Sequence, residues 1–217
     1  MANPKNRAVG LLALACVTIL IVHSGRPGFS NASRPAREIP NSVVALQMAR
    51  SADEVDDVLG DAPSPDREAM RIKQYIDFAF IAAYAGLYIA LARMFRSRIA
   101  TIAAICGVAA AVFDIVENVA ILRILDVPLR ATTQAMVDSI RYPSLAKWTL
   151  AFAATALFGE AFWMSRLRPM QVIAALNFAA AAIGFYGLYD NAFLVWAGLP
   201  MLGGLAAMIA VFLFIRR

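Results

Sequence analysis

The chain contains few charged residues, two cysteines and a single histidine. Only 16% of its 217 residues are charged, whereas 61% are hydrophobic, which is more than a water-soluble domain of this length normally carries. Cys16 and Cys106 both lie in apolar segments, so we expect neither a disulfide framework nor a metal cluster. One histidine also excludes a histidine-based metal site and a di-haem pair. The excess of apolar residues predicts an all-α, polytopic membrane helix bundle.

Sequence motifs of several protein classes are absent. The chain has no glycine-rich phosphate-binding loop, no His-Glu-x-x-His metal pattern and no Gly-x-Ser-x-Gly nucleophile elbow. Its net charge of +5 comes from basic residues at the ends of apolar runs, and these form no basic patch interleaved with aromatic residues. We therefore expect no nucleic-acid partner and no metal ion, and the sequence identifies no cofactor.

Six apolar segments are long enough to cross a bilayer, because a membrane-spanning helix needs about 20 residues. We predict six transmembrane helices near residues 7–23, 74–95, 99–123, 145–165, 169–189 and 192–215. Only Asp190 and Asn191 separate the last two, which predicts a tight antiparallel hairpin. Alternatively, part of 192–199 lies in the membrane interface and Pro200 kinks the last span. The predicted regions are an N-terminal anchor (1–23), an extracytoplasmic connector with short helices (24–73) and a five-helix bundle (74–217).

Basic residues predict the orientation, since Lys and Arg are enriched on the cytoplasmic side of membrane proteins. With the N-terminus inside, the cytoplasmic segments contain no acid and hold Lys5, Arg7, Arg93, Arg96, Arg98, Arg166, Arg168, Arg216 and Arg217. Both termini are then cytoplasmic, and residues 24–73 lie outside the cell membrane. The first segment also resembles a signal peptide, whose cleavage would leave five spans. Retention is favoured because residues 23–26 lack a small-x-small cleavage pattern.

The predicted connector divides into a turn-rich half and a helical half. Glycine and proline are frequent from residue 25 to residue 40, as is typical of irregular chain. Asn41 is expected to cap a helix over 42–50, and Ser51 with Glu54 forms a capping-box pattern for a helix that ends before Gly60. Ser64 marks the start of a helix that continues into the second span. The connector either lies on the membrane or covers a pocket between the spans.

Seven acids lie between residues 53 and 68, but their spacing does not match the Asp-x-Asp-x-Asp-Gly calcium loop. We therefore expect a solvated acidic helix surface. A second external connector covers residues 126–146, in which residues 131–140 are expected to form an interfacial helix. Pro143 and Ser144 are expected to mark the start of the fourth span.

Ionisable residues inside the spans are the candidate functional residues, because lipid is a costly environment for charge. The third span contains the run Asp-Ile-Val-Glu-Asn, whose spacing places Asp114, Glu117 and Asn118 on one helical face in the outer half of the bilayer. Polar and aromatic groups lie at the same level of other spans. The predicted ligand-binding residues are Asp77, Tyr84, Asp114, Glu117, Asn118, Tyr186, Asp190 and Asn191.

Two interpretations of these residues differ in what they imply. In the first, the side chains line a water-accessible polar pocket near the outer surface. In the second, Asp114 and Glu117 are structural, either paired with Arg123, Lys147 or Lys73 or hydrogen-bonded to tyrosines. Glu160, near the inner end of the fourth span, is expected to be structural and satisfied by nearby arginines.

Three functions remain open, all of them in a lipid bilayer, and the third needs no small-molecule site. We favour the binding or transport of a small molecule, a lipid headgroup or a cation. The second is a membrane enzyme in which one carboxyl group acts as a general acid or base. The third is an accessory protein whose external helices dock a membrane-protein partner. A pathway that continues to the cytoplasmic side would favour transport, whereas a closed pocket with a nucleophile or activated water would favour catalysis.

Overall fold

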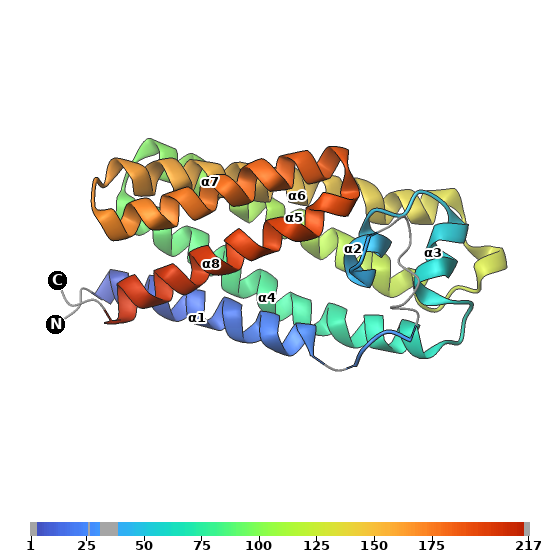
Figure 1. The fold of residues 1–217 in the computed structure, drawn as a ribbon. Helices are drawn as coiled ribbons and strands as arrows, with labels where there is room; N and C mark the ends of the chain where they lie inside the picture. Colours follow the sequence, from blue (N-terminus) through green and yellow to red (C-terminus); the bar gives the residue numbers. More distant parts are fainter. Residues whose placement is uncertain (1–3, 26, 31–38, 215–217) are drawn as a thin grey trace.

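The computed structural model describes residues 4–25, 27–30 and 39–214 (Figure 1). Helices make up 86% of these residues, and no strand occurs among them, so the predicted all-α class is confirmed. Five segments are long and apolar enough to cross a membrane, as expected of a multi-pass membrane protein. They are Asn6–Ser24 of α1 (Pro4–Ser24), α4 (Pro65–Phe95), α5 (Arg98–Ile124), α7 (Arg168–Tyr189) and Asn191–Phe214.

The last of these segments changes helix type along its length. It begins as the 3₁₀ helix η3 (Asn191–Ala197), continues as α8 (Gly198–Ile209) and ends in the π-helical turn η4 (Ala210–Phe214). Pro200 lies in the first turn of α8, where its missing N–H costs no intrahelical hydrogen bond. Only Asp190 separates α7 from η3, and the two pack together, so the predicted hairpin is present.

A sixth long helix, α6 (Gln134–Met164), differs from its prediction in two respects. Lys147 and Glu160 interrupt its apolar stretch, and it is not among the five helices that qualify as spans by length and composition. It is also continuous from its start, so residues 131–140 form no separate interfacial helix and Pro143 lies inside the helix. The helix begins earlier because the Thr133 side chain caps it by accepting a hydrogen bond from the Met136 N–H.

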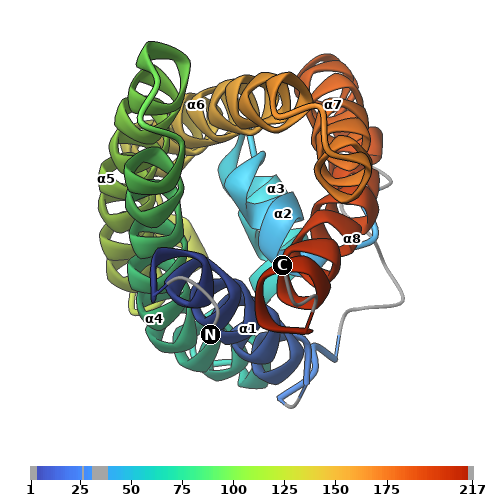
Figure 2. The ribbon, with the colours of Figure 1, turned by 90° about the vertical axis from the view of Figure 1, so that its left-hand side faces the viewer.

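The long helices form a closed ring. In Figure 2 the ring runs from α1 through α4, α5, α6, α7 and α8, and each helix packs against the next, with α8 returning to α1. Because neighbouring helices alternate in direction, the start of α1 and the end of η4 lie at one end of the bundle (Figure 1). The short helices α2 (Ser42–Gln47) and α3 (Ala52–Leu59) lie at the other end, where they cover the ring. We call α2 and α3 the cap.

The two ends of the ring differ in charge. At the end away from the cap, tight connections join α4 to α5 and α6 to α7, and Arg96 and Arg166 close them in the left-handed region with φ of 51° and 55°. This end carries Arg7, Arg93, Arg96, Arg98, Arg166 and Arg168. Arg216, Arg217 and the side chain of Lys5 lie outside the described residues. The cap end also carries arginines, among them Arg67, Arg71 and Arg130, but it holds in addition the acids of residues 53–68 together with Asp126 and Asp138.

The three helices α2, α3 and α4 begin at N-capping side chains, as predicted. The Asn41 side chain accepts hydrogen bonds from the first turn of α2, and Ser51 and Ser64 do the same for α3 and α4. Helix α2 is shorter than the predicted range 42–50, whereas α4 runs unbroken from the cap into the ring, as expected. Residues 26 and 31–38 of the predicted turn-rich half lie outside the described residues.

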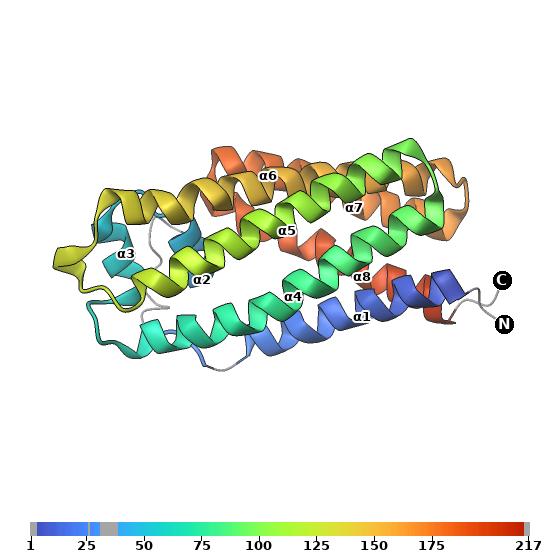
Figure 3. The same ribbon diagram turned by 180° about the vertical axis from the view of Figure 1, so that it is seen from behind.

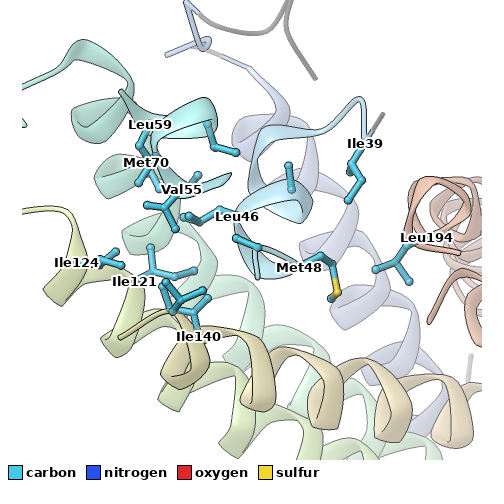
Figure 4. Packing of buried hydrophobic residues seen from close by; sticks show 14 of the residues in the cluster. Ile39, Leu46, Met48, Val55, Leu59, Met70, Ile121, Ile124, Ile140 and Leu194 are labelled. Carbon is cyan, nitrogen blue, oxygen red and sulfur yellow. The ribbon is translucent and has the colours of Figure 1, made fainter. Parts of the chain in front are cut away.

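The cap packs onto the ring through a continuous apolar core, which Figure 4 shows. Leu46 of α2 and Val55 and Leu59 of α3 are buried, in the same cluster as Ile121 of α5 and Ile140 of α6. This core places the cap directly over the interior of the ring.

A buried arginine joins the cap to the ring at the end of α3. The Nη1 atom of Arg67 donates hydrogen bonds to the carbonyl oxygens of Ile124 (2.9 Å), Leu125 (3.1 Å) and Val127 (2.9 Å) at the end of α5. Its Nε atom donates to the carbonyl oxygen of Gly60 just after α3 (2.9 Å). Arg67 therefore joins α3, α4 and α5 and satisfies carbonyl groups that a helix end leaves unpaired.

Candidate functional site

The interior of the ring beneath the cap contains a group of charged side chains from α5 and α6. The Nζ atom of Lys147 lies 2.8 Å from Asp114 Oδ1 and 2.8 Å from Glu117 Oε2, and each of the three side chains is at most 7% exposed. Lys147 is therefore the partner of both carboxyl groups. Of the other cations considered from the sequence, Arg123 is exposed, and Lys73 donates to the carbonyl oxygens of His23 and Gly25.

The polar contacts extend from α5 to α4. The Tyr84 hydroxyl donates to Asp114 Oδ2 (2.9 Å), and the Asn118 amide donates to Asp77 Oδ2 (2.8 Å). As the spacing predicted, Asp114, Glu117 and Asn118 share one buried face of α5. Five of the eight predicted ligand-binding residues thus lie together where α4 meets α5.

The cap also contributes to this group through Gln47. The Gln47 side-chain amide donates to Glu117 Oε1 (2.7 Å), and its oxygen accepts from Trp148 Nε1 (3.2 Å). Gln47 is buried, and it occupies the last position of α2. Gln47 follows four apolar residues in α2, and this was the sequence signal for the contact, but the sequence alone does not show where the helix points.

Ser144 is the second member that sequence reasoning missed. Its hydroxyl lies 2.6 Å from Glu117 Oε2 and 2.8 Å from the Ile140 carbonyl oxygen, and its side chain is buried. We call the whole set the buried cluster. Its members are Gln47, Asp77, Tyr84, Asp114, Glu117, Asn118, Ser144 and Lys147.

The buried cluster has more acids than bases. Asp77, Asp114 and Glu117 supply three carboxyl groups, and among the described residues Lys147 is the one cation that is hydrogen-bonded to any of them. The remaining members are neutral amides and hydroxyl groups. In a medium of low polarity, one ammonium group balances one carboxylate and leaves the other two uncompensated.

Hydrogen-bond acceptors without partners lie beside Asp77. Asn118 Oδ1 and Gln74 Oε1 are both buried and accept no hydrogen bond from the described part of the chain. Gln74 lies one turn before Asp77 on α4, and Asn118 is bonded to Asp77. Asp77 itself remains partly accessible, unlike Asp114 and Glu117. This side of the buried cluster therefore offers acceptors but few donors.

The other three predicted residues lie at the turn between α7 and η3. The Tyr186 ring is half-exposed and packs edge-on against Phe193 at 5.1 Å. Asp190 accepts a hydrogen bond from the Ala192 N–H (3.3 Å), and the Asn191 amide donates to the Gly187 carbonyl oxygen (3.1 Å). Within the described ranges, no hydrogen bond or ring contact joins this turn to the buried cluster. These three residues have local roles in the turn.

Two further observations limit the chemistry of the site. In the part of the chain that the structure describes, no group of three or more His, Cys, Asp or Glu side chains could hold a metal ion. Glu160 is exposed on α6, and none of the ion pairs between described residues includes it. The expected pairing of Glu160 with arginines is therefore not present.

Asp61 at the cap end is a carboxylate held by backbone N–H groups. Asp61 Oδ1 accepts hydrogen bonds from the backbone N–H groups of Leu129 (2.7 Å) and Ala62 (2.9 Å). These two bonds favour the ionised form and lower the pKa of Asp61. Because Leu129 belongs to η2 (Leu129–Ala131), between α5 and α6, Asp61 ties the segment after α3 to that connection.

Comparison of the chain with protein-family models, with curated proteins and with solved structures found no match. The functional argument therefore rests on the geometry and charge of the buried cluster.

Proposed function

We propose that the protein crosses the cell membrane six times, with both termini in the cytoplasm and the cap outside. The sixth span is α6, whose 31 residues at about 1.5 Å each exceed the roughly 30 Å of a bilayer core. Its position between α5 and α7 in the ring supports this assignment, because its neighbours are both candidate spans. The short helix connections at the end away from the cap carry arginines and no acid, and this asymmetry supports the orientation.

We further propose that the buried cluster binds a small ligand that carries an ammonium group. The observation that supports this most strongly is the charge balance of three carboxyl groups and one lysine in a buried site. Burial disfavours uncompensated negative charge, so the site needs two further positive charges in addition to Lys147, supplied by protons or by cations. An ammonium ligand supplies one of these charges and competes with a proton for it.

The hydrogen bonds of Ser144 support a protonated state when no ligand is bound. A hydroxyl group has one proton to donate, yet Ser144 Oγ lies within hydrogen-bond distance of both Glu117 Oε2 and the Ile140 carbonyl oxygen. If Ser144 donates to the Ile140 carbonyl oxygen, its own oxygen can accept a hydrogen bond from the carboxyl O–H of a neutral Glu117. Both contacts are then satisfied, and the buried cluster carries less negative charge.

The unpartnered acceptors support a ligand that only donates hydrogen bonds. An ammonium group has donors and no acceptor, which suits the Asn118 and Gln74 oxygens beside Asp77. In this proposal Asp77 supplies the negative charge that contacts the ligand. Asp114 and Glu117, held by Lys147, set the charge of the site.

Binding is favoured over transport by the packing of the other half of the ring. Apolar side chains from all six long helices form a packed hydrophobic core there, which includes Leu91, Phe158, Phe162, Ile173 and Met208. This apolar packing separates the buried cluster from the arginine-rich end. On the side of the buried cluster that faces the cap, Gln47 of α2 covers Glu117. We therefore propose that the ligand enters between the cap and the ring.

Trp148 offers a direct test of ligand binding, because it is hydrogen-bonded to Gln47 above the site. In a Trp163→Phe, Trp196→Phe background, the fluorescence of Trp148 should change saturably when methylammonium is added to the protein in lipid nanodiscs. Tetramethylammonium, which lacks N–H donors, should give a much weaker response.

The matched variants are Asp77→Asn and Glu160→Gln. Asp77→Asn should abolish the methylammonium response, because it removes the charge proposed to contact the ligand. Glu160→Gln removes an exposed acid and should leave the response unchanged. A response that is the same in both variants, or none in the parent protein, would refute ammonium binding at the buried cluster.

A further inference from the structure

A second site lies on the outside of the ring, at the cap end of α5 and α6. An open groove of about 570 Å³ runs between these helices, which lie side by side in Figure 3. Its floor is apolar, and Ile115, Val116 and Val119 present more than a third of their surface there. In the proposed topology α5 crosses the membrane, which places these exposed side chains against the bilayer and not water.

A charged residue stands at one end of this apolar groove. Arg123 lines the groove in the last turn of α5 and is exposed. Nearby arginines differ from it: Arg71 pairs with Asp126 and Glu68, and Arg67 donates to backbone carbonyl oxygens. None of the hydrogen bonds or ion pairs between described residues includes Arg123. Its guanidinium group is therefore free to bind an anion from the membrane.

We infer that this groove binds a glycerophospholipid, with one acyl chain along α5 and the phosphate on Arg123. The two parts of the groove match the two parts of that molecule. The apolar floor of the groove accommodates one acyl chain. The guanidinium group of Arg123 can form paired hydrogen bonds with the phosphate oxygens. Ser139, also in the lining, donates its hydroxyl hydrogen to the Met136 carbonyl oxygen, so Arg123 is the lining residue that can donate to the phosphate.

The position of Arg123 agrees with the depth of a headgroup. Arg123 is one residue from the end of α5, whereas Ile115 lies two turns deeper in the span. A lipid whose phosphate contacts Arg123 therefore extends its chain past Val119 and Ile115 toward the middle of the bilayer. This inference depends on α5 crossing the membrane and not on the ligand proposed for the buried cluster.

Native mass spectrometry of the full chain in detergent micelles tests the inference. The probes are palmitoyl-oleoyl-phosphatidylglycerol, monogalactosyldiacylglycerol with the same chains, and glycerol phosphate. The protein should keep phosphatidylglycerol under conditions that remove the uncharged glycolipid, and glycerol phosphate should neither bind nor compete. Arg123→Gln should lower phosphatidylglycerol affinity by about tenfold, the effect of losing charge-assisted hydrogen bonds.

Two further variants make the result decisive. Arg130→Gln removes an exposed arginine at the same end of the bundle that does not line the groove, and it should retain the lipid. Val119→Trp fills the groove from an exposed position and should release the lipid while Arg123 is intact. Equal losses of lipid in Arg123→Gln and Arg130→Gln would show that the lipid responds to the overall positive charge of this end and not to Arg123, which would overturn the inference. Competition by glycerol phosphate, or unchanged binding in Val119→Trp, would show that the groove holds no chain. Competition by glycerol phosphate and unchanged binding in Val119→Trp would each overturn the inference.

Discussion

Replacement of Lys147 by methionine should destabilise the protein more than any other single substitution in the buried cluster. Methionine keeps the length of the side chain but removes the ammonium group, which lies 2.8 Å from both Asp114 and Glu117. The site then holds three carboxyl groups without a cation. Because Asp114 is bonded to Tyr84 of α4 and Glu117 to Ser144 of α6, these two buried carboxyl groups cannot move apart to reach water.

The expected loss can be scaled from similar buried ion pairs. Removing one partner of such a pair typically costs about 3–5 kcal/mol, because the other charge stays buried without compensation. If the cost comes from uncompensated charge, removal of the acids should recover part of it. The triple variant Lys147→Met, Asp114→Asn, Glu117→Gln should therefore be more stable than Lys147→Met alone, by about 1–3 kcal/mol.

The free energy of unfolding in lipid nanodiscs or mixed micelles provides the measurement. The matched control is Arg141→Met, which removes a partly exposed cation from the same helix. Arg141→Met should change the stability by less than about 0.5 kcal/mol. If Lys147→Met is equally mild, or if the triple variant is less stable than Lys147→Met, the reasoning from charge balance is wrong.

Three other predictions concern the cap and the ring. Gln47→Ala leaves Glu117 and Trp148 without their shared partner and should cost about 1–3 kcal/mol, with faster hydrogen exchange in α2 and unchanged exchange in α7. Gly107→Ala places a methyl group against the Tyr88 ring and should lower the unfolding temperature, whereas Gly203→Ala meets Leu176 at an ordinary 3.5 Å and should not; equal shifts would contradict this. The two backbone hydrogen bonds lower the pKa of Asp61, so cap stability should be full above about pH 3.9, the unfolded value, and should fall as the pH drops through the lower folded value. Asp61→Asn should remove this acid-dependent loss in α3 hydrogen exchange.

Local signals in the sequence predicted the helices well. Asn41, Ser51 and Ser64 cap helices where their spacing indicated, because a capping side chain bonds to backbone only two or three residues away. Helical periodicity likewise predicted the shared face of Asp114 and Glu117. Lys147 was among the partners considered for these acids, and the structure selects it from the three cations.

Features that depend on the packing of the whole ring were not predictable in the same way. The contact of Gln47 with Glu117 joins residues 70 positions apart, and it requires the cap to lie over the interior. Tyr186 belongs to the predicted level of the bundle, but the rotation of α7 turns its ring outward. The early start of α6 was missed because Pro143 suggested a boundary, whereas packing against α5 and α7 accommodates a proline inside the helix.

The most direct test of the central claim is to count the protons released when methylammonium binds to the protein in weakly buffered solution. The buried cluster needs a proton when no cation is present, so about one proton should be released for each methylammonium bound. The Asp77→Asn variant should bind little methylammonium and release no protons. Binding without proton release, or release that persists in Asp77→Asn, would contradict the exchange of a proton for a cation at this site.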